Sequence, residues 1–316
     1  MSATEDPVRI FVGTDRSQLL AVKVLDYSVR RHTDLPVELI PMLDLPLPEP
    51  RDLRQRQRTG FSFARFAIPR LAGYRGRALY LDADMLVLQD IAELWTLPFD
   101  GAKVIIQEAI PEEHRGKRRL GRTRRAKQCS VMLLDCERLD WQPEAIIAGL
   151  DGAYGYEDLV HRLCILDETE IRYAVPFRWN SLEVYRPETC LIHYTDMETQ
   201  PWVSTDNRNG WLWLNEVKQM LEAGALSWAE IEEEVRFGHF RPSLLAELRL
   251  PADHSIADRT RKAMLDRIDA DAGFIKHRAA YAAMREREAA ARSSLSTRLL
   301  PLRRTFGRAA RRYGLR

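Results

Sequence analysis

One stretch of the sequence, residues 77–88 (RALYLDADMLVL), limits the possible folds more than any other. It is short, mostly apolar and contains aromatic and β-branched side chains, which favours a buried strand over a helix. If the strand ends near Leu81, the carboxylates of Asp82 and Asp84 can converge there, because positions two apart in a strand share a face. Burying two carboxylates is unfavourable unless a partner such as a divalent cation binds them, and that cation can hold a diphosphate. The alternative is that one carboxylate caps a helix beginning near Asp90.

The segments around this stretch alternate between strand-like and helix-like patterns. Residues 8–12 read as a strand that runs into Gly13-Thr14-Asp15 and then into a helix over 17–31. Strand, tight turn and helix begin an α/β nucleotide-binding unit, although the dinucleotide fingerprint GxGxxG is absent. We expect further strands at 37–42, 103–108, 130–135 and 172–180, and helices at 51–71, 143–150, 215–223 and 228–236.

Charge is distributed unevenly along the 316 residues. The net charge is +2, but residues 273–316 hold 12 basic and 2 acidic residues, whereas the remainder holds 36 and 44. An acidic body with a basic tail suggests an anionic partner for the tail. The four cysteines show no metal-binding spacing, and neither a signal peptide nor a membrane-spanning run is apparent, so we expect a cytoplasmic protein.

Two motifs together resemble glycosyltransferase family 8, which includes glycogenin and bacterial lipooligosaccharide galactosyltransferases. The first is YLDADMLV at 80–87, followed by DIAELW at 90–95, and the second is LIHYTDMETQPW at 191–202. The resemblance covers about residues 8–202. It implies a GT-A fold, which is a Rossmann-like mixed α/β sheet flanked by helices. It also implies a metal-dependent, retaining enzyme that uses a nucleotide sugar, usually a UDP-sugar.

The resemblance also implies particular site residues. Asp82, Asp84 and His193 would bind Mn²⁺ or Mg²⁺, and Glu157 or Asp158 would lie near the anomeric carbon of the donor sugar. The nucleotide sugar would be contacted by residues from several segments: Thr14, Asp15, Arg65, Asp82, Ala83, Gln128, Gln200 and Trp202.

Several positions depart from the family pattern. Glu157 replaces a Gln beside the reacting carbon, where a carboxylate can act as a nucleophile or stabilise positive charge; the alternative is an acidic residue favoured at a helix N-terminus. Gln128 begins a segment that replaces Asn-Ala-Gly, and Asp196 replaces a Gly. Gln200 replaces the Lys that meets the diphosphate. The segment 115–127, with eight basic residues, can supply the missing cation or is simply a solvated loop.

We therefore expect a GT-A domain over residues 1–245 and a helical extension over 246–316, with a long helix from 259 to about 292. The expected activity is transfer of a hexose, with retention, from a nucleotide sugar to a glycan or lipid-linked acceptor. The alternative is a catalytically weak module that binds nucleotide sugars. The acidic body, and the lack of stacking aromatic residues among the arginines, argue against nucleic-acid binding.

The tail at 293–316 reads as a basic amphipathic helix with an apolar face at Leu302, Phe306 and Tyr313; the alternative is a disordered, solvated basic end. Such a helix suits the anionic inner face of a cell membrane, where each basic residue contributes about 1 kcal/mol. The full chain should therefore co-sediment with anionic liposomes at low salt and leave them at high salt. A chain ending at Arg292 should stay in the supernatant, and equal binding of both chains would remove the tail from membrane attachment.

Overall fold

The computed structural model describes residues 7–108, 127–250 and 258–277, together with the single positions 282, 286 and 289. Most of the basic segment 115–127 and the whole tail at 293–316 lie outside these residues. Within the described part of the chain, no helix combines the length and the apolar character that crossing a membrane requires.

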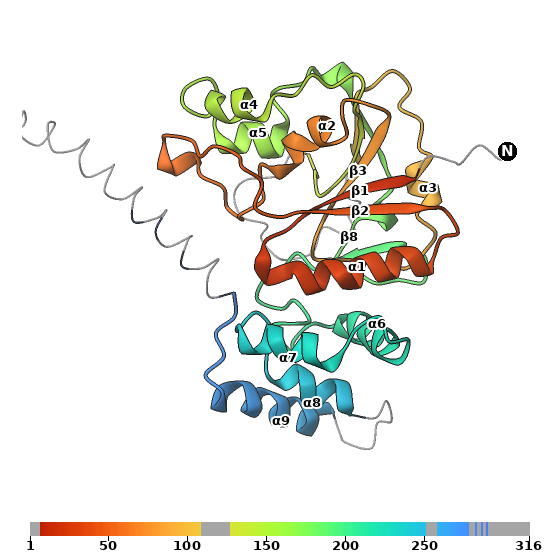
Figure 1. Cartoon of the computed structure of the whole chain (residues 1–316), viewed down its shortest axis with the longest axis vertical. Coiled ribbons are helices and arrows are strands. Elements are labelled where there is room, and N and C mark those ends of the chain that lie inside the picture. Colours follow the sequence, from red (N-terminus) through yellow and green to blue (C-terminus); the bar gives the residue numbers. More distant parts are fainter. Residues whose placement is uncertain are drawn as a thin grey trace, which may run out of the picture.

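A six-stranded mixed sheet forms the centre of the molecule (Figure 1). Its order is β2-β1-β3-β6-β5-β7; β6 runs antiparallel to β3 and β5, whereas the other pairs are parallel. The strands span Val8–Gly13 (β1), Val37–Met42 (β2), Arg77–Asp82 (β3), Val104–Gln107 (β5), Val131–Asp135 (β6) and Ile171–Val175 (β7). The expected mixed α/β architecture is thus confirmed.

Side-chain alternation along β3 explains why helices cover both faces of this sheet. Ala78 and Tyr80 join one apolar cluster, while Leu79 and Leu81 join another on the opposite face. On the first face lie α2 (Ile68–Leu71), α4 (Pro143–Gly149) and α5 (Tyr156–Arg162), and on the second lie α1 (Leu19–Arg31) and α3 (Ala92–Trp95).

A second, three-stranded sheet extends from the end of β3. It consists of β4 (Met85–Val87), β9 (Leu191–His193) and β8 (Ser181–Leu182), in the order β4-β9-β8. The antiparallel pair β4–β9 places Met85 opposite His193. Residues more than a hundred positions apart in sequence therefore meet just beyond the end of β3.

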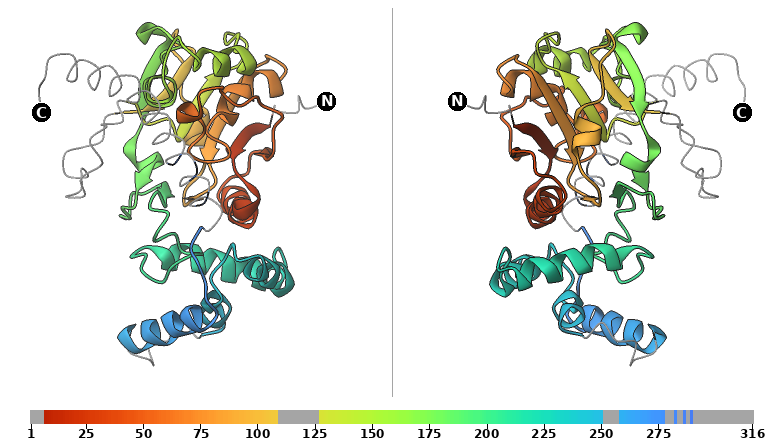
Figure 2. Two further views of the ribbon diagram at one scale, coloured as in Figure 1. Left: turned by 90° about the vertical axis from the view of Figure 1, so that its left-hand side faces the viewer. Right: turned by 90° about the vertical axis from the view of Figure 1, so that its right-hand side faces the viewer.

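Four helices form a further layer beyond α1 (Figures 1 and 2). They are α6 (Gly210–Glu222), α7 (Trp228–Arg236), α8 (Ser243–Arg249) and α9 (Asp258–Asp271). Trp202, Trp213 and Phe240 are fully buried at their centre, and Leu20 and Val24 of α1 join the same cluster. The proposed domain boundary at 245/246 falls inside α8, and the division of the chain there stays a prediction.

Two expected helices differ from the structure. Residues 51–71 hold only short 3-10 turns, Leu53–Gln55 and Ala64–Ala67, and the single turn of α2. Phe61, Phe63 and Phe66 are all buried there, so the segment winds around its aromatic side chains and has no single apolar stripe.

The expected helix from 259 to about 292 is interrupted: α9 ends at Asp271, residues 272–277 are not helical, and of the residues from 278 to 292 only 282, 286 and 289 are described, all three as helical. Gly273 adopts φ +64°, a left-handed conformation that glycine tolerates. The backbone N–H groups of Gly273 and Phe274 bond to the carbonyls of Ala270 and Asp269, which closes the helix C-terminus. Similarly, β7 ends at Val175, before Pro176, rather than continuing to 180.

The buried tryptophans of the helical layer offer a stability test within one helix. Trp213 of α6 is 1% exposed, whereas Trp211, two positions earlier, is 48% exposed. Trp213→Ala should lower the free energy of unfolding by about 3–5 kcal/mol because it leaves a large cavity. Trp211→Ala should lower it by less than about 1 kcal/mol. Urea unfolding of both variants measures the difference, and similar losses would contradict this packing.

Candidate functional site

The candidate site lies where β3 ends and the small sheet begins. Asp82 is the last residue of β3, and Asp84 directly precedes β4. The backbone N–H of Tyr194, the residue after β9, donates a hydrogen bond to the carbonyl of Asp84 (2.8 Å). Two sheets thus hold the Asp82–Asp84 turn and His193 at one place.

Asp82, Asp84 and His193 form the site's central cluster. Each can offer one ligand atom such that all three atoms lie within 4.8 Å of one another. The Nε2 atom of His193 is 3.0 Å from Asp84 Oδ1 and 3.9 Å from Asp82 Oδ2. Two carboxylate oxygens and one imidazole nitrogen at this spacing fit a divalent metal ion, so the three expected ligands are brought together.

Asn180 orients the imidazole of His193. The Nδ1 atom of His193 lies 3.0 Å from Asn180 Oδ1, and the amide nitrogen of Asn180 donates to Gln107 Oε1 (2.6 Å) and Ser130 Oγ (3.1 Å). Because the Asn180 oxygen can only accept, Nδ1 carries the proton and Nε2 is the nitrogen suited to a metal. Asn180 is the last residue of the strand expected over 172–180, but nothing in the sequence indicated its contact with His193.

Arg65 offsets the negative charge of Asp82. Its side chain is buried, and its Nη2 atom lies 3.6 Å from Asp82 Oδ1. The same nitrogen donates a hydrogen bond to the Tyr80 hydroxyl (3.0 Å). The Tyr80 hydroxyl in turn donates to Asp82. Burial raises the pKa of Asp82; Arg65 opposes that rise, and the nearby charge of Asp84 adds to it. Arg65 therefore lies beside the cluster, and its contact with a donor stays a prediction.

Gln200 supports Asp84 directly. It is fully buried, and its Nε2 donates to Asp84 Oδ2 (2.9 Å) and to the carbonyl of Tyr194 (3.0 Å). Trp202, 1% exposed, packs against Trp213 with ring centroids 5.4 Å apart. Gln200 thus holds the Asp84 carboxylate in place, and Trp202 packs in the core of the helical layer. Contacts of either residue with a donor stay predictions.

The first turn of the chain is tightly packed. Asp15 Oδ1 accepts hydrogen bonds from the N–H of Ser17 (2.9 Å) and from its hydroxyl (2.6 Å), so Asp15 caps the 3-10 turn Arg16–Gln18 before α1. A Cβ atom on Gly13 would lie 2.5 Å from the Tyr80 hydroxyl, so only glycine fits between β1 and β3. Thr14 is buried next to this contact.

Glu157 and Asp158 occupy the first turn of α5. Glu157 forms ion pairs with Arg58 and His161. Asp158 accepts from the N–H of Gly155 (3.1 Å) and pairs with Arg162 (2.9 Å). Among the interactions of the described residues, neither carboxylate contacts the central cluster, and their proximity to the donor sugar stays a prediction.

The two remaining expected donor contacts lie next to β3 and before β6. Ala83, between the two aspartates, is 1% exposed. Gln128 is partly buried in the segment that leads into β6. Their contacts with a donor likewise stay predictions.

His277 is a site residue that the sequence did not suggest. It is 9% exposed and lies after α9, in the segment that had been assigned to one long helix. The backbone of Met197 hydrogen-bonds its ring. Burial lowers the pKa of His277, whereas the carboxylates of Asp15, Asp84 and Glu198 act in the opposite direction. The chain changes direction at Gly273, after α9, and this turn brings the imidazole of His277 close to the site.

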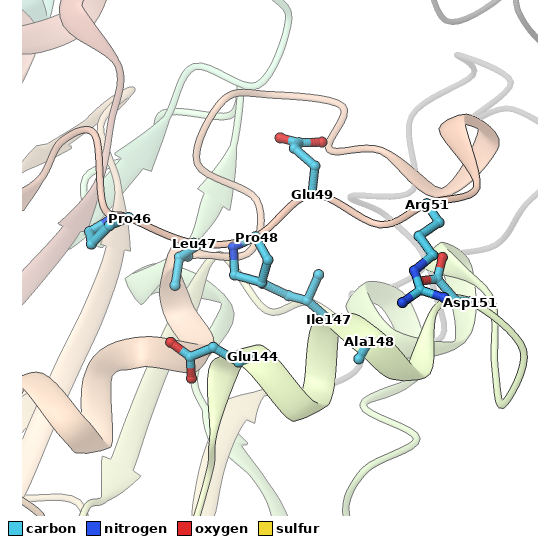
Figure 3. A pocket seen from close by; sticks show the side chains of 9 residues that line it. All are labelled: Pro46, Leu47, Pro48, Glu49, Arg51, Glu144, Ile147, Ala148 and Asp151. Atoms are coloured by element: carbon cyan, nitrogen blue, oxygen red, sulfur yellow. The ribbon is translucent and has the colours of Figure 1, made fainter.

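One hollow in the described part of the surface does not coincide with the cluster. It has a volume of about 750 Å³ and lies between the Pro-rich loop at 46–51 and α4 (Figure 3). Arg51 and Asp151 face each other at one end, and Glu144 lies at the other. None of the cluster residues lines it, so the chemistry is assigned to the cluster and not to this hollow.

The comparisons with known proteins agree with this arrangement. The profile of Glycosyl transferase family 8 matches residues 17–131. Protein CDI of Arabidopsis thaliana is 32% identical over 239 residues, which are 69% of this chain and 89% of that protein.

Among solved structures, the apo WbbM bifunctional glycosyltransferase superposes with a TM-score of 0.52 at 13% identity, over 74% of this chain and 52% of that chain. This chain therefore spans about half the length of WbbM. The apo form of GlyE from Streptococcus pneumoniae TIGR4 gives 0.49 at 14% identity, over 75% and 65% of the two chains. From the relative, the family profile and the fold, the chain belongs to glycosyl transferase family 8 and has the GT-A fold of a glycosyltransferase.

Proposed function

We propose that this protein transfers a hexose, with retention, from a nucleotide sugar to a glycan or lipid-linked acceptor, and that the donor is a UDP-sugar. The observation that carries the proposal is the cluster of Asp82, Asp84 and His193, whose ligand atoms lie within 4.8 Å of one another. A diphosphate needs a cation beside it, and this cluster is built to hold one.

The residues that would hold Mn²⁺ or Mg²⁺ are Asp82, Asp84 and His193, and a bound ion would supply Lewis-acid stabilisation of the leaving diphosphate. Gln200 would keep the Asp84 carboxylate oriented, and Asn180 would keep the protonated nitrogen of His193 away from the ion. Both supporting side chains are fully buried, so their positions are well defined before any ligand binds.

The donor is proposed to extend from the first turn to the central cluster. Thr14 and Asp15 would meet the nucleoside, while Arg65 and Ala83 would lie beside the phosphates and the sugar. Arg65 supports this role because its guanidinium is already 3.6 Å from Asp82, at the centre of the site. Gln128 and Trp202 are proposed as outer contacts.

Glu157 and Asp158 are proposed to lie near the anomeric carbon. Tyr156, their neighbour on α5, packs against Phe63 with ring centroids 5.9 Å apart, and Phe63 lies two positions before Arg65, which supports a position of this helix end beside the site. A carboxylate there would stabilise positive charge that develops on the sugar, or would act as a nucleophile.

A second candidate function is a binding module with weak catalysis. The observation that favours it is that the Glu157 carboxylate already contacts two side chains, Arg58 and His161, rather than being free to face a sugar. Nucleotide release from a nucleotide sugar without acceptor would distinguish a transferase from a binding module.

We also propose that the protein is cytoplasmic and attaches peripherally to the inner face of the cell membrane through residues 293–316.

The metal ligands give the most direct test. Asp84→Asn and His193→Ala should each reduce turnover to near background and weaken Mn²⁺ binding, because each removes one of three ligands; EDTA should do the same to the unmodified protein. Asn180→Ala should weaken metal binding by about 10- to 100-fold, since it removes the partner that orients His193. Calorimetric Mn²⁺ titration and nucleotide release from a panel of nucleotide sugars provide the measurements.

Asp90→Asn is the matched control for these variants, because Asp90 is an exposed aspartate near the same strands and lies outside the cluster. It should bind Mn²⁺ and release nucleotide as the unmodified protein does. Full activity in the presence of EDTA would rule out a metal-dependent mechanism.

Glu157→Gln tests the role of the carboxylate at α5. Turnover should fall by on the order of a hundredfold, the effect of losing one electrostatic contact in the transition state, while donor affinity stays nearly unchanged. Glu144→Gln is a matched control, because Glu144 is also the second residue of its helix and also pairs with an arginine, Arg70 (2.7 Å). If turnover is the same in both variants and the unmodified protein, Glu157 has only a structural role.

A further inference from the structure

The short segment after α9 returns to the central cluster from the end of the helical layer. Figure 1 shows this segment, in blue, rising from α9 toward the end of α1 at which that helix begins. Lys276 attaches it to the loop that follows β9, because its Nζ donates to the carbonyl of Glu198 (2.7 Å) and to Ser204 Oγ (3.0 Å). The same loop carries Gln200 and Tyr194, both of which bond to Asp84.

His277, the next residue, presents an unsatisfied nitrogen within this packing. The ring is 9% exposed, and its Nε2 atom is inaccessible to solvent and has no hydrogen-bond partner among the described residues. Because the backbone of Met197 bonds the ring, that bond is made at Nδ1. A buried polar atom without a partner is unfavourable unless a ligand supplies the missing bond.

The surroundings of this nitrogen indicate what the ligand is. Lys276, the residue before His277, bonds to the loop from which Gln200 donates to Asp84, so the ring lies close to the central cluster. The carboxylates of Asp15 at the first turn and Asp84 in the cluster also act electrostatically on the ring. His277 is not among the three residues whose ligand atoms lie within 4.8 Å of one another, so it is a neighbour of the metal site and not a fourth ligand. A nucleotide whose nucleoside meets Asp15 and whose phosphates meet the metal has to pass between them.

We propose that Nε2 of His277 donates a hydrogen bond to a phosphate oxygen of the nucleoside diphosphate group, so that the segment after α9 completes the donor site. This inference rests on the proposed function. An anionic phosphate beside the ring favours the imidazolium form, in which Nδ1 donates to Met197 and Nε2 donates to the phosphate. His277 would thereby supply the cation that is missing at Gln200, whose amide is already engaged with Asp84.

His277→Asn isolates this nitrogen. The asparagine amide can keep the bond that Nδ1 makes to Met197, and asparagine tolerates the left-handed backbone of this position (φ +42°), but it has no atom at the place of Nε2. His32→Asn is the matched control, because His32 lies at the opposite end of α1, about 20 Å from Asp15 for a 13-residue helix.

Three titrations by calorimetry make the test: UDP with Mn²⁺, uridine alone, and Mn²⁺ alone. With His277→Asn, affinity for UDP with Mn²⁺ should fall about tenfold or more, as for a lost charge-assisted hydrogen bond, while uridine and Mn²⁺ bind as before. His32→Asn should match the unmodified protein in all three titrations. Unchanged uridine binding also reports that the variant is folded.

The outcomes separate this inference from the proposed function. If the unmodified protein binds UDP with Mn²⁺ and His277→Asn binds it equally well, the role of His277 is overturned and the proposed function stands. The role is also overturned if uridine affinity falls as much as UDP affinity, because His277 then supports the fold or the nucleoside. If the unmodified protein does not bind UDP with either Mn²⁺ or Mg²⁺, both proposals fail.

Discussion

The site has to accommodate two carboxylates placed side by side at the end of a buried strand, and its other residues are arranged around them. Asp82 and Asp84 repel each other, and burial raises the pKa of Asp82. The structure offsets this with donors: Arg65 and the Tyr80 hydroxyl lie beside Asp82, and the Gln200 amide donates to Asp84. This compensation leaves the carboxylates close enough together for a divalent ion, which would neutralise them more completely than any of these side chains.

The sequence, together with its resemblance to family 8, predicted the mixed α/β architecture and the three residues that the structure brings together. The apolar strand that runs into Asp82 and Asp84 favoured a cation site by itself, whereas His193 was added by the resemblance. The sequence could not predict how Gln200 behaves. A glutamine in place of a lysine suggested a missing cation, but not that its amide would bond to Asp84. Such a contact depends on the β4–β9 register and has no local pattern.

Two expected helices were wrong because of local packing and backbone conformation. The three buried phenylalanines of 51–71 leave only short turns there, and the left-handed Gly273 interrupts the helix expected over 259–292. The second error also concealed His277, because a residue in the middle of a long solvent-exposed helix gives no reason to suspect a role in the site. The role of Asn180 was missed for a different reason. Asn180 acts through buried hydrogen bonds to Gln107 and Ser130, which are distant in sequence and leave no local pattern.

The close contact between Gly13 and the Tyr80 hydroxyl has a mechanical consequence. Tyr80 also bonds Asp82, so the first turn of the chain and the Asp82 end of β3 are joined through a single side chain without space between them. The first turn and the central cluster therefore form one rigid base. Under the proposed function, an opening that admits or releases a nucleotide would come from the segments that cover this base, such as the described residues that follow β9 and α9.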